Sequence, residues 1–299
     1  MSVITNVVLA GATGNLGPAI LEQLVKAGFK VTVFTRQGST HEFPASVTVK
    51  SVDYDSVEAL AAALQGQDAV VSTLGIAALS KQLNLVEAAV KAKVTRFIPS
   101  EFGSDTTNAK NAALPVFADK VAIHKALAKE AANEKISYTS MITGPFFDWC
   151  LKAGLILNIG EKSISLYDGG ERYFSTTTLE SVGKAVAAVL KKPEETKNRA
   201  VYVQDTALTQ KQIRAIAEKV TGTAWQAKEV SVANDVLPAA FAELKKENPD
   251  PHKFGIPMII GSIFGEGHGS HFQKLDNELL GLKQFTDAEV EAVLAAATK

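Results

Sequence analysis

The chain has 299 residues, of which 46% are hydrophobic and 21% charged, ordinary values for a globular protein of one large or two modest domains. The formal net charge of -1 leaves no basic surplus for binding nucleic acid or an anionic membrane surface. No apolar run reaches the ~18 residues that a membrane-spanning helix needs, so we expect no contact with a membrane.

A buried strand and a glycine-rich turn lie near the N-terminus. Residues 7–10 (Val-Val-Leu-Ala) form a short apolar run, typical of a strand that is covered on both faces. Gly11 would permit the turn, Gly14 would let the backbone approach a ligand, and Gly17 would let helix and strand pack closely. Pro18 suits the first turn of a helix. A helix N-terminus at this place binds phosphate, although a tight turn without a ligand would need the same glycines.

Strands and helices alternate through the first half of the chain. Strands separated by helical patterns of this length are typical of βαβ units. They predict an α/β fold with a Rossmann-like, doubly wound parallel sheet, whose ligands bind outside the carboxyl ends of the strands. The expected strands are residues 30–35, 47–52, 69–73, 96–99 and 136–142, and the expected helices are about 56–64, 79–93 and 118–133.

Arg36, at the end of the second predicted strand, favours NADP over NAD. A fold that binds NAD places a carboxylate there for the ribose 2′-hydroxyl, but the first acid downstream is Glu42. An arginine can pair with a 2′-phosphate instead, and Ser39 and Thr40 offer hydroxyl donors to the same group. The alternative is a solvated surface arginine, the usual state of this side chain.

Other strand ends supply further candidates. Asp53 follows the third strand, where its carboxylate would either accept from the adenine amino group or cap the next helix. Leu74 and Gly75 close the fourth strand and are expected to approach the nucleotide, unless the glycine only shapes a turn.

Three aromatic residues follow the sixth strand. Phe146 lies nearest the strand end and is the best candidate to contact the nicotinamide. Phe147 and Trp149 would wall an apolar substrate pocket, but packing in the core is an equally good interpretation of each ring taken singly.

Ser100 and Lys120 are the residues on which the prediction of catalysis depends. Ser100 ends the fifth strand on the ligand side of the sheet, and Lys120 lies in the next helix. A lysine beside a cationic nicotinamide and apolar walls would have a lowered pKa and could serve in proton transfer. Residue type alone leaves two alternatives open, a bond to the nicotinamide ribose and an ordinary exposed helix lysine.

These motifs together resemble a known family. The turn 11–17, Arg36, the run 96–103 (Arg-Phe-Ile-Pro-Ser-Glu-Phe-Gly) and Lys120 are similar to the isoflavone reductase-like, NmrA-like branch of the atypical short-chain dehydrogenases. This branch includes phenylcoumaran benzylic ether, pinoresinol–lariciresinol and isoflavone reductases. Run 96–103 is the most specific match, and the resemblance covers about residues 5 to 150 well and the remainder loosely.

The resemblance implies an NADPH-dependent reductase with a Rossmann domain and a smaller, interleaved C-terminal α+β domain that closes over the substrate. The family's catalytic lysine maps onto Lys120. The tyrosine position of the Tyr-x-x-x-Lys motif of ordinary short-chain dehydrogenases is Val116 here, which argues against their mechanism. The helix after the lysine, residues 121–125, is less basic than in the plant reductases. The substrate of this chain could therefore differ from theirs.

We therefore expect hydride transfer to a small aromatic or conjugated carbonyl, enone or benzylic ether, with Lys120 assisting proton transfer. An NmrA-like NADP sensor without catalysis is the alternative, and a nucleotide-sugar epimerase or dehydratase is disfavoured. Lys120 is the expected catalytic residue, and no metal is expected. The side chains expected to bind substrate are Phe102, Phe147 and Trp149. The expected NADP(H) contacts are Gly11, Thr13, Gly14, Asn15, Leu16, Gly17, Arg36, Asp53, Leu74, Gly75, Ser100, Lys120 and Phe146.

The second half is less regular. We expect an NADP-binding domain over residues 1–150, rejoined by about 174–205, and a mainly substrate-binding domain over 151–299. Residues 163–173 resemble a hairpin around an Asp-Gly-Gly turn. Residues 254–272 are glycine-rich and carry His268 and His271, which predicts either a loop over the substrate or an ordinary surface loop. The other expected elements are a strand at 200–203 and helices at about 179–190, 209–220, 232–246 and 287–296.

Cys150 is the single cysteine, so no intrachain disulfide can form, and this is typical of a reducing compartment. The N-terminus lacks a basic-then-apolar signal pattern. We expect a cytoplasmic protein that binds a small molecule and no nucleic acid, with a homodimer as an open possibility.

Overall fold

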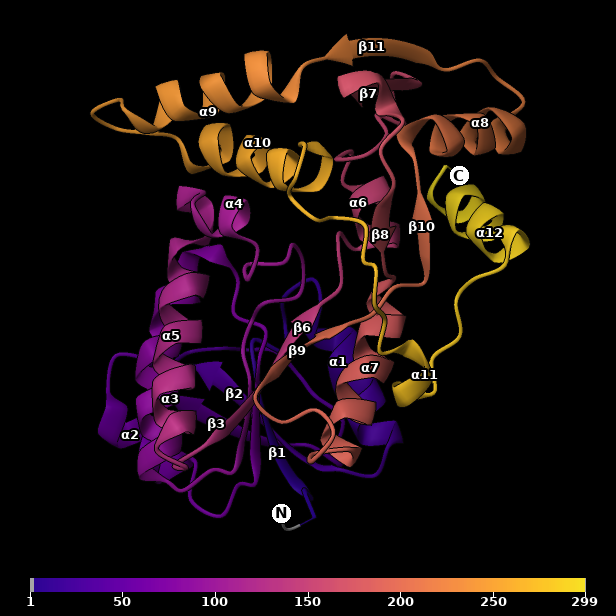
Figure 1. The fold of residues 1–299 in the computed structure, drawn as a ribbon. Helices are drawn as coiled ribbons and strands as arrows, with labels where there is room; N and C mark the ends of the chain where they lie inside the picture. The colour runs from indigo at the N-terminus through magenta and orange to yellow at the C-terminus, as the bar shows by residue number, and fades with distance from the viewer. Residues whose placement is uncertain (1–2, 299) are drawn as a thin grey trace.

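The computed structural model describes residues 3–298. A seven-stranded parallel sheet forms the lower half of the molecule in Figure 1. Its order is β3-β2-β1-β4-β5-β6-β9. The predicted α/β class and doubly wound sheet are therefore confirmed. The strands are β1 (Asn6–Ala10), β2 (Lys30–Arg36), β3 (Thr48–Val52), β4 (Ala69–Ser72), β5 (Arg96–Ile98), β6 (Ser137–Ile142) and β9 (Arg199–Tyr202).

The order in which successive strands join the sheet reverses between β1 and β4, although all seven strands are parallel. The chain runs outward from β1 through β2 to β3 and then crosses back to place β4 on the other side of β1. The carboxyl ends of β1 and β4 thus diverge into helices on opposite faces and leave a crevice between them. Gly11 and Thr73 follow these two strands and meet at this point, since Thr73 Oγ1 donates to the Gly11 carbonyl at 2.9 Å.

Helices cover both faces of the sheet. One face packs against α1 (Gly17–Lys26) and α7 (Leu179–Lys191), and the other packs against α2 (Val57–Ala63), α3 (Gln82–Lys91) and α5 (Ala118–Ala132). Each helix buries an apolar stripe against strands that are apolar on both sides, as the near-continuous Val and Leu runs of β1 and β4 predict.

The last strand of the sheet comes from far along the chain. β9 pairs with β6 in parallel, from Thr139↔Arg199 to Ile142↔Tyr202. α7, which precedes β9, packs beside α1, and an added Cβ at Gly183 of α7 would lie only 2.6 Å from the Ala19 carbonyl oxygen. Residues after 178 therefore return to complete the sheet.

Most of the remaining elements form a second lobe, at the top of Figure 1, around a separate apolar core that includes Phe147, Phe174, Trp225 and Phe264. Its elements are α6 (Phe147–Lys152), β7 (Ser163–Tyr167), β8 (Phe174–Thr176), β10 (Thr206–Leu208), α8 (Gln210–Thr221), β11 (Gln226–Val230), α9 (Leu237–Leu244), α10 (Pro251–Phe264) and α12 (Asp287–Ala297). Shorter segments are the 3-10 turns η1 (Ile76–Lys81), η2 (Pro115–Phe117) and η3 (Asp168–Gly170), the π-helical turn η4 (Val232–Val236), α4 (Ala109–Ala112) and α11 (Asn277–Leu280).

The hairpin expected over residues 163–173 is wrong. β7 pairs in parallel with β11, starting at Ser163↔Gln226, and β8 pairs with β10 in an antiparallel way. The segment 168–170 does turn the chain, with positive φ at all three residues, but it sends the two strands to different partners.

The loop expected over residues 254–272 is also largely wrong, because α10 continues to Phe264. Two glycines lie within this helix, and a Cβ added at Gly261 would meet Leu237 Cδ2 at 2.6 Å. The small residue therefore lets α9 approach α10 closely. Only residues 265–272 form a loop, and His268 in it is hydrogen-bonded to Asn111 rather than free to bind a ligand.

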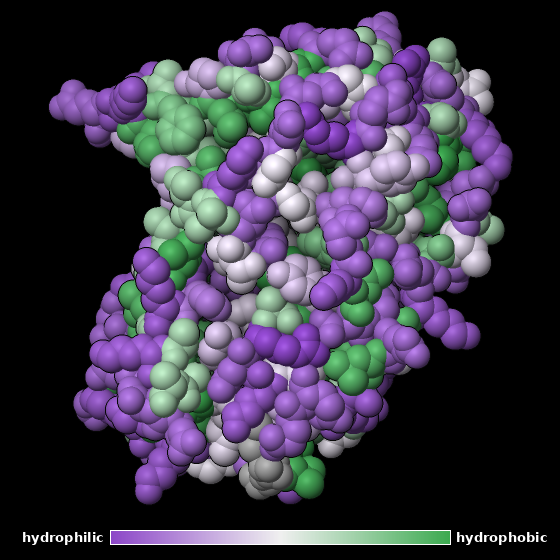
Figure 2. Space-filling model, viewed as in Figure 1, coloured by the Kyte–Doolittle hydropathy of each residue, from purple (hydrophilic) through white to green (hydrophobic). Residues whose placement is uncertain are grey.

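Exposed apolar side chains gather over α9 and α10, at the upper left of Figure 2. Phe241 and Ile256 are 38% and 37% exposed there. None of the helices formed by residues 3–298 is both long and apolar enough to cross a membrane.

Candidate functional site

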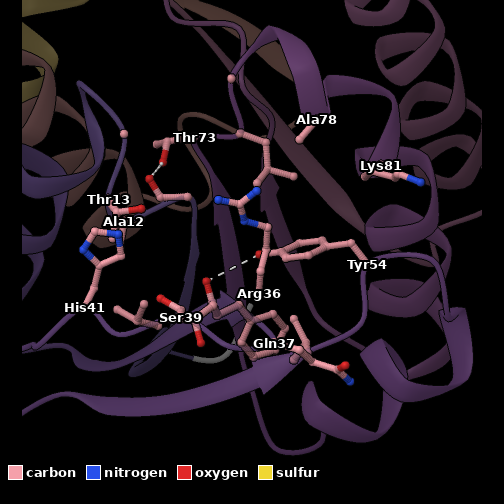
Figure 3. A pocket seen from close by; sticks show the side chains of 18 of the residues that line it. Ala12, Thr13, Arg36, Gln37, Ser39, His41, Tyr54, Thr73, Ala78 and Lys81 are labelled. Atoms are coloured by element: carbon pink, nitrogen blue, oxygen red, sulfur yellow. Dashed lines mark hydrogen bonds between the residues drawn. The ribbon is translucent and has the colours of Figure 1, made fainter.

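A cavity of about 790 Å³ opens at the carboxyl ends of β1 to β4, where the strand order reverses (Figure 3). It brings together seven of the residues expected to bind NADP(H). Those seven are Gly11, Thr13, Gly14, Arg36, Asp53, Leu74 and Gly75.

The three glycines of the turn have different surroundings. Gly11 has φ +92°, and an added Cβ would lie 2.7 Å from the Thr73 carbonyl oxygen. A Cβ on Gly17 would lie 2.4 Å from the Gly11 oxygen, so these two positions have no room for a side chain. A Cβ on Gly14 would meet nothing closer than 3.5 Å. Gly14 therefore keeps open space within the cavity, the place where the backbone can approach a ligand.

Helix α1 follows this turn directly, but its first residues do not belong to the lining of the cavity. Its first residues are Gly17 and Pro18, and the N-cap residue Leu16 makes no side-chain hydrogen bond. The first amides of α1 are thus left for another acceptor. Leu16 is buried and Asn15 is exposed, and neither belongs to the lining of the cavity.

Arg36 projects into the cavity from the end of β2 (Figure 3). Its side chain is exposed and lies beside the ring of Tyr54, and among residues 3–298 its guanidinium forms no ion pair. Burial raises the pKa of the Tyr54 phenol, and the positive charge of Arg36 opposes that shift. The cavity therefore contains an uncompensated cation at the position where a carboxylate would select NAD.

Asp53 does not cap the next helix. Ser56 is the N-cap of α2 and accepts from the Ala59 amide at 3.2 Å. The Asp53 carboxylate instead accepts from the Asp55 amide at 2.9 Å and remains exposed on the cavity wall. Of the two roles expected for Asp53, the capping role is thus wrong.

Ser100 links two strand ends behind the cavity. Its hydroxyl donates to the Leu74 carbonyl at 2.9 Å, and its amide donates to Gln82 Oε1 at 2.9 Å. Gln82 is fully buried, so these bonds fix the end of β5 against the end of β4. Gly75 begins the turn η1 and faces open space.

Lys120 lies in the first turn of α5, outside the lining of the large cavity. Its ammonium donates to the main-chain carbonyl of Glu101 and lies 5.7 Å from the centre of the Phe117 ring. Burial lowers the pKa of Lys120, and the negative charge of Glu101 opposes that shift. The ordinary exposed lysine, the alternative that residue type left open, is therefore wrong. Val116, at the usual tyrosine position, is a partly buried apolar residue beside α10.

The four aromatic candidates differ in accessibility. Phe146 is partly exposed where the two lobes meet, between β6 and α6. Phe102 is 8% exposed and packs in the core of the sheet, and Phe147 has no exposed surface. Trp149 is partly buried against the core of the second lobe. In this conformation Phe147 thus offers no surface to a ligand, because the apolar core surrounds it.

Residue patterns did not single out several cavity residues. His41 lies on the same side of the view as Ala12 and Thr13, and Lys81, which pairs with Asp55, lies at the other side beyond Tyr54 (Figure 3). They lie on a loop and a 3-10 turn that carry no motif. The one available signal was their place downstream of the ends of β2 and β4.

Comparisons with known proteins agree with this geometry. The model of the NmrA-like family matches residues 5–248. Oxidoreductase aprR of Aspergillus flavus is 34% identical over 285 residues, which cover 92% of this chain and 94% of that protein. Phenylcoumaran benzylic ether reductase IRL1 of Ginkgo biloba is 25% identical over 97% of this chain and 96% of its own length.

A solved structure with the same fold is AtPrR2 with NADP+ and (+)pinoresinol. It superposes with a TM-score of 0.80 over 99% of this chain and 100% of its own, at 24% sequence identity. The likeness extends over both lobes.

Proposed function

The chain is an oxidoreductase that belongs to the NmrA-like family, and from this premise we propose that it reduces a small aromatic or conjugated substrate with NADPH. The substrate class is a carbonyl, an enone or a benzylic ether. The observation that carries the choice of cofactor is the unpaired guanidinium of Arg36 in a cavity that is also lined by the glycine turn.

The residues of the cavity fit a dinucleotide phosphate. The open space at Gly14 and the free amides of α1 suit a pyrophosphate. Arg36 suits a 2′-phosphate, with Ser39 and Thr40 nearby as hydroxyl donors. Leu74 and Gly75 form the wall toward the centre of the sheet.

When bound, the cofactor supplies the hydride. Lys120 then serves in proton transfer, because the Glu101 carbonyl holds its ammonium in place and burial lowers its pKa. We propose that it donates a proton to, or stabilises, the oxygen that gains negative charge in the substrate. Phe146 is proposed to contact the nicotinamide ring, while Phe102 and Trp149 are proposed to shape the substrate wall.

The nature of the substrate is supported by the relatives. AtPrR2 is a structure with (+)pinoresinol, and the Ginkgo relative is a phenylcoumaran benzylic ether reductase. We propose the same broad class of aromatic substrate here.

Arg36→Ala tests the cofactor. A charge-assisted, bidentate contact contributes about 1.5–3 kcal/mol, so the variant should bind NADPH about 10- to 100-fold more weakly and NADH almost unchanged. Arg214→Ala, which removes an arginine paired with Glu218 on α8, is the matched control and should change neither affinity. Equal losses for the two cofactors in Arg36→Ala would refute the 2′-phosphate contact.

Lys120→Ala tests the reaction. NADPH oxidation is followed with a panel of aromatic enones, ketones and benzylic ethers. Loss of the general acid should lower kcat by about 10²- to 10⁴-fold while NADPH still binds. Tight NADPH binding with no turnover by the wild-type protein would favour the alternative of an NADP sensor.

A further inference from the structure

The turn that follows β5 contains a buried acid whose main chain contacts Lys120. Glu101 is 2% exposed, and its carboxylate accepts a hydrogen bond from Thr106 Oγ1 at 3.1 Å. The main-chain carbonyl of the same residue accepts from the Lys120 ammonium. Glu101 thus acts on Lys120 through two groups: its main-chain carbonyl, which contacts the ammonium, and its carboxylate, which contributes a negative charge.

The conformation of this turn is unusual. Phe102 has φ +28°, in a region that a phenylalanine rarely adopts. The turn is held on both sides: Glu101 donates from its amide to the Pro99 carbonyl at 2.8 Å, and the Gly103 carbonyl accepts from the Gly144 amide at 3.1 Å. Strained backbone persists only where its surroundings determine it, and the residue before Phe102 is the one whose carbonyl accepts from Lys120.

The charges around the pair are few. His124 lies one helical turn after Lys120 on α5, and Asp105 follows Glu101 on the same loop. His124 favours the ionised form of the Glu101 carboxylate and Asp105 opposes it, while Phe117 faces the ammonium with its ring. Glu101 is the one group whose charge acts appreciably on Lys120 among residues 3–298.

We propose that Glu101 is a positioning residue for Lys120: its main-chain carbonyl holds the ammonium in place, and its buried carboxylate is the counter-charge that keeps the amine protonated. This inference rests on the proposed function only in giving Lys120 a part in the reaction. The contact, the burial and the charges exist without it.

The direction of the effect follows from the charges. Burial lowers the pKa of Lys120 and raises that of Glu101, and each charge opposes the shift of the other. Removing the carboxylate charge should therefore lower the pKa of Lys120 further. The limb of the pH–rate profile that reports Lys120 moves to lower pH in either case, whether the lysine acts as the acid or as the base.

Glu101→Gln is the main test, because it keeps the size of the side chain and an acceptor for Thr106. The lysines are reductively methylated with ¹³C, and the resonance of Lys120 is assigned by its absence in Lys120→Arg. We expect its titration midpoint to fall by about one pH unit in Glu101→Gln, as for the loss of a nearby opposite charge. The Lys120 limb of the pH profile of kcat should move by the same amount.

Two further variants sharpen the result. Thr106→Val removes the donor to the carboxylate, disfavours its ionised form and should give a smaller shift in the same direction, even if Glu101→Gln fails to fold. Asp119→Asn removes an exposed acid next to Lys120 on α5 and should leave the titration unchanged. Unchanged Lys120 midpoints in folded Glu101→Gln and Thr106→Val would overturn the proposal.

The NMR titration also separates this proposal from the proposed function. A shifted Lys120 midpoint supports the role of Glu101 even if no substrate is turned over, an outcome that would count against the reductase alone. A purely structural role for Glu101 predicts a lower melting temperature with an unshifted midpoint, and that result would refute the inference.

Discussion

Gly17→Ala is expected to destabilise the protein, because the new methyl group overlaps backbone atoms of the glycine turn. The new Cβ would lie 2.4 Å from the Gly11 carbonyl oxygen and 2.5 Å from the Ala12 carbonyl carbon. Both atoms are backbone at the start of a buried helix, so relief requires the turn and α1 to separate. Overpacking of this kind costs up to about 3 kcal/mol. At an unfolding entropy of about 2.1 cal/mol/K per residue, that loss lowers Tm by about 5 °C for a chain of this size.

Gly14→Ala is the matched comparison, because the nearest atom to its new Cβ is 3.5 Å away. Its Tm should stay within about 1 °C of wild type, since the glycine has no positive φ to lose and the unfolded chain becomes less flexible. Its NADPH affinity should fall at least about tenfold, or about 1.4 kcal/mol, because the methyl group enters the cavity. Differential scanning fluorimetry and NADPH fluorescence titration measure the two effects.

The pair of variants can refute the reasoning in two ways. An unchanged Tm in Gly17→Ala would show that the turn can move away from α1 at little cost. An unchanged NADPH affinity in Gly14→Ala would place the cofactor elsewhere.

Three further predictions concern buried groups. The guanidinium of Arg96 is fully buried and donates hydrogen bonds to the hydroxyl groups of Ser137, Thr139 and Thr196. Arg96→Lys should therefore lower the free energy of unfolding, measured in urea, by about 3 kcal/mol. A change below about 1 kcal/mol would contradict this structural role. Burial raises the pKa of the Cys150 thiol to about 12, so the native protein should react with Ellman's reagent at pH 8 at least about 100-fold more slowly than the unfolded chain; prompt reaction of the native thiol would be the contrary result. Burial lowers the pKa of His268 below 6.5, so the unfolded state binds more protons and stability falls as the pH drops below about 6.5. His268→Asn should flatten that decline in Tm between pH 7 and 5, and an identical decline in both proteins would argue against it.

Local patterns carried the cofactor half of the fold. The glycine spacing, the apolar strands and the alternation with helices are each written within 10 to 20 residues, so β1 to β6 and their helices fell close to the expected bounds. Arg36 was found in the same way, because the end of β2 is fixed by the strand that precedes it.

Long-range pairing was not readable in the same way. β7 looked like half of a hairpin because a turn follows it, but its partner β11 lies some 60 residues further on. The glycines of α10 resembled a loop because a sequence pattern does not tell a flexible glycine from one that admits a neighbouring helix. Gly261 is of the second kind, since Leu237 fills the space beside it.

The candidate site shows the same division. Lys120 and Glu101 are adjacent in space because α5 returns over the end of β5, and the resemblance rather than the residue pattern pointed to the lysine. Phe147 shared a motif with Phe146, yet the first turn of α6 directs it into the second core while its neighbour stays at the junction. Which of two successive aromatic rings is accessible depends on packing from distant segments.

The position of β9 in the sheet decides whether the first 150 residues could fold without the rest of the chain. A fragment ending near residue 150 would lack both β9 and α7. It would expose β6 as an open edge whose residues are buried in the whole chain, and it would uncover the apolar side of α1. Open edges of this kind promote aggregation. The lobe that contains the sheet is therefore not an independent module, and one cut near residue 150 cannot separate the two lobes of this chain.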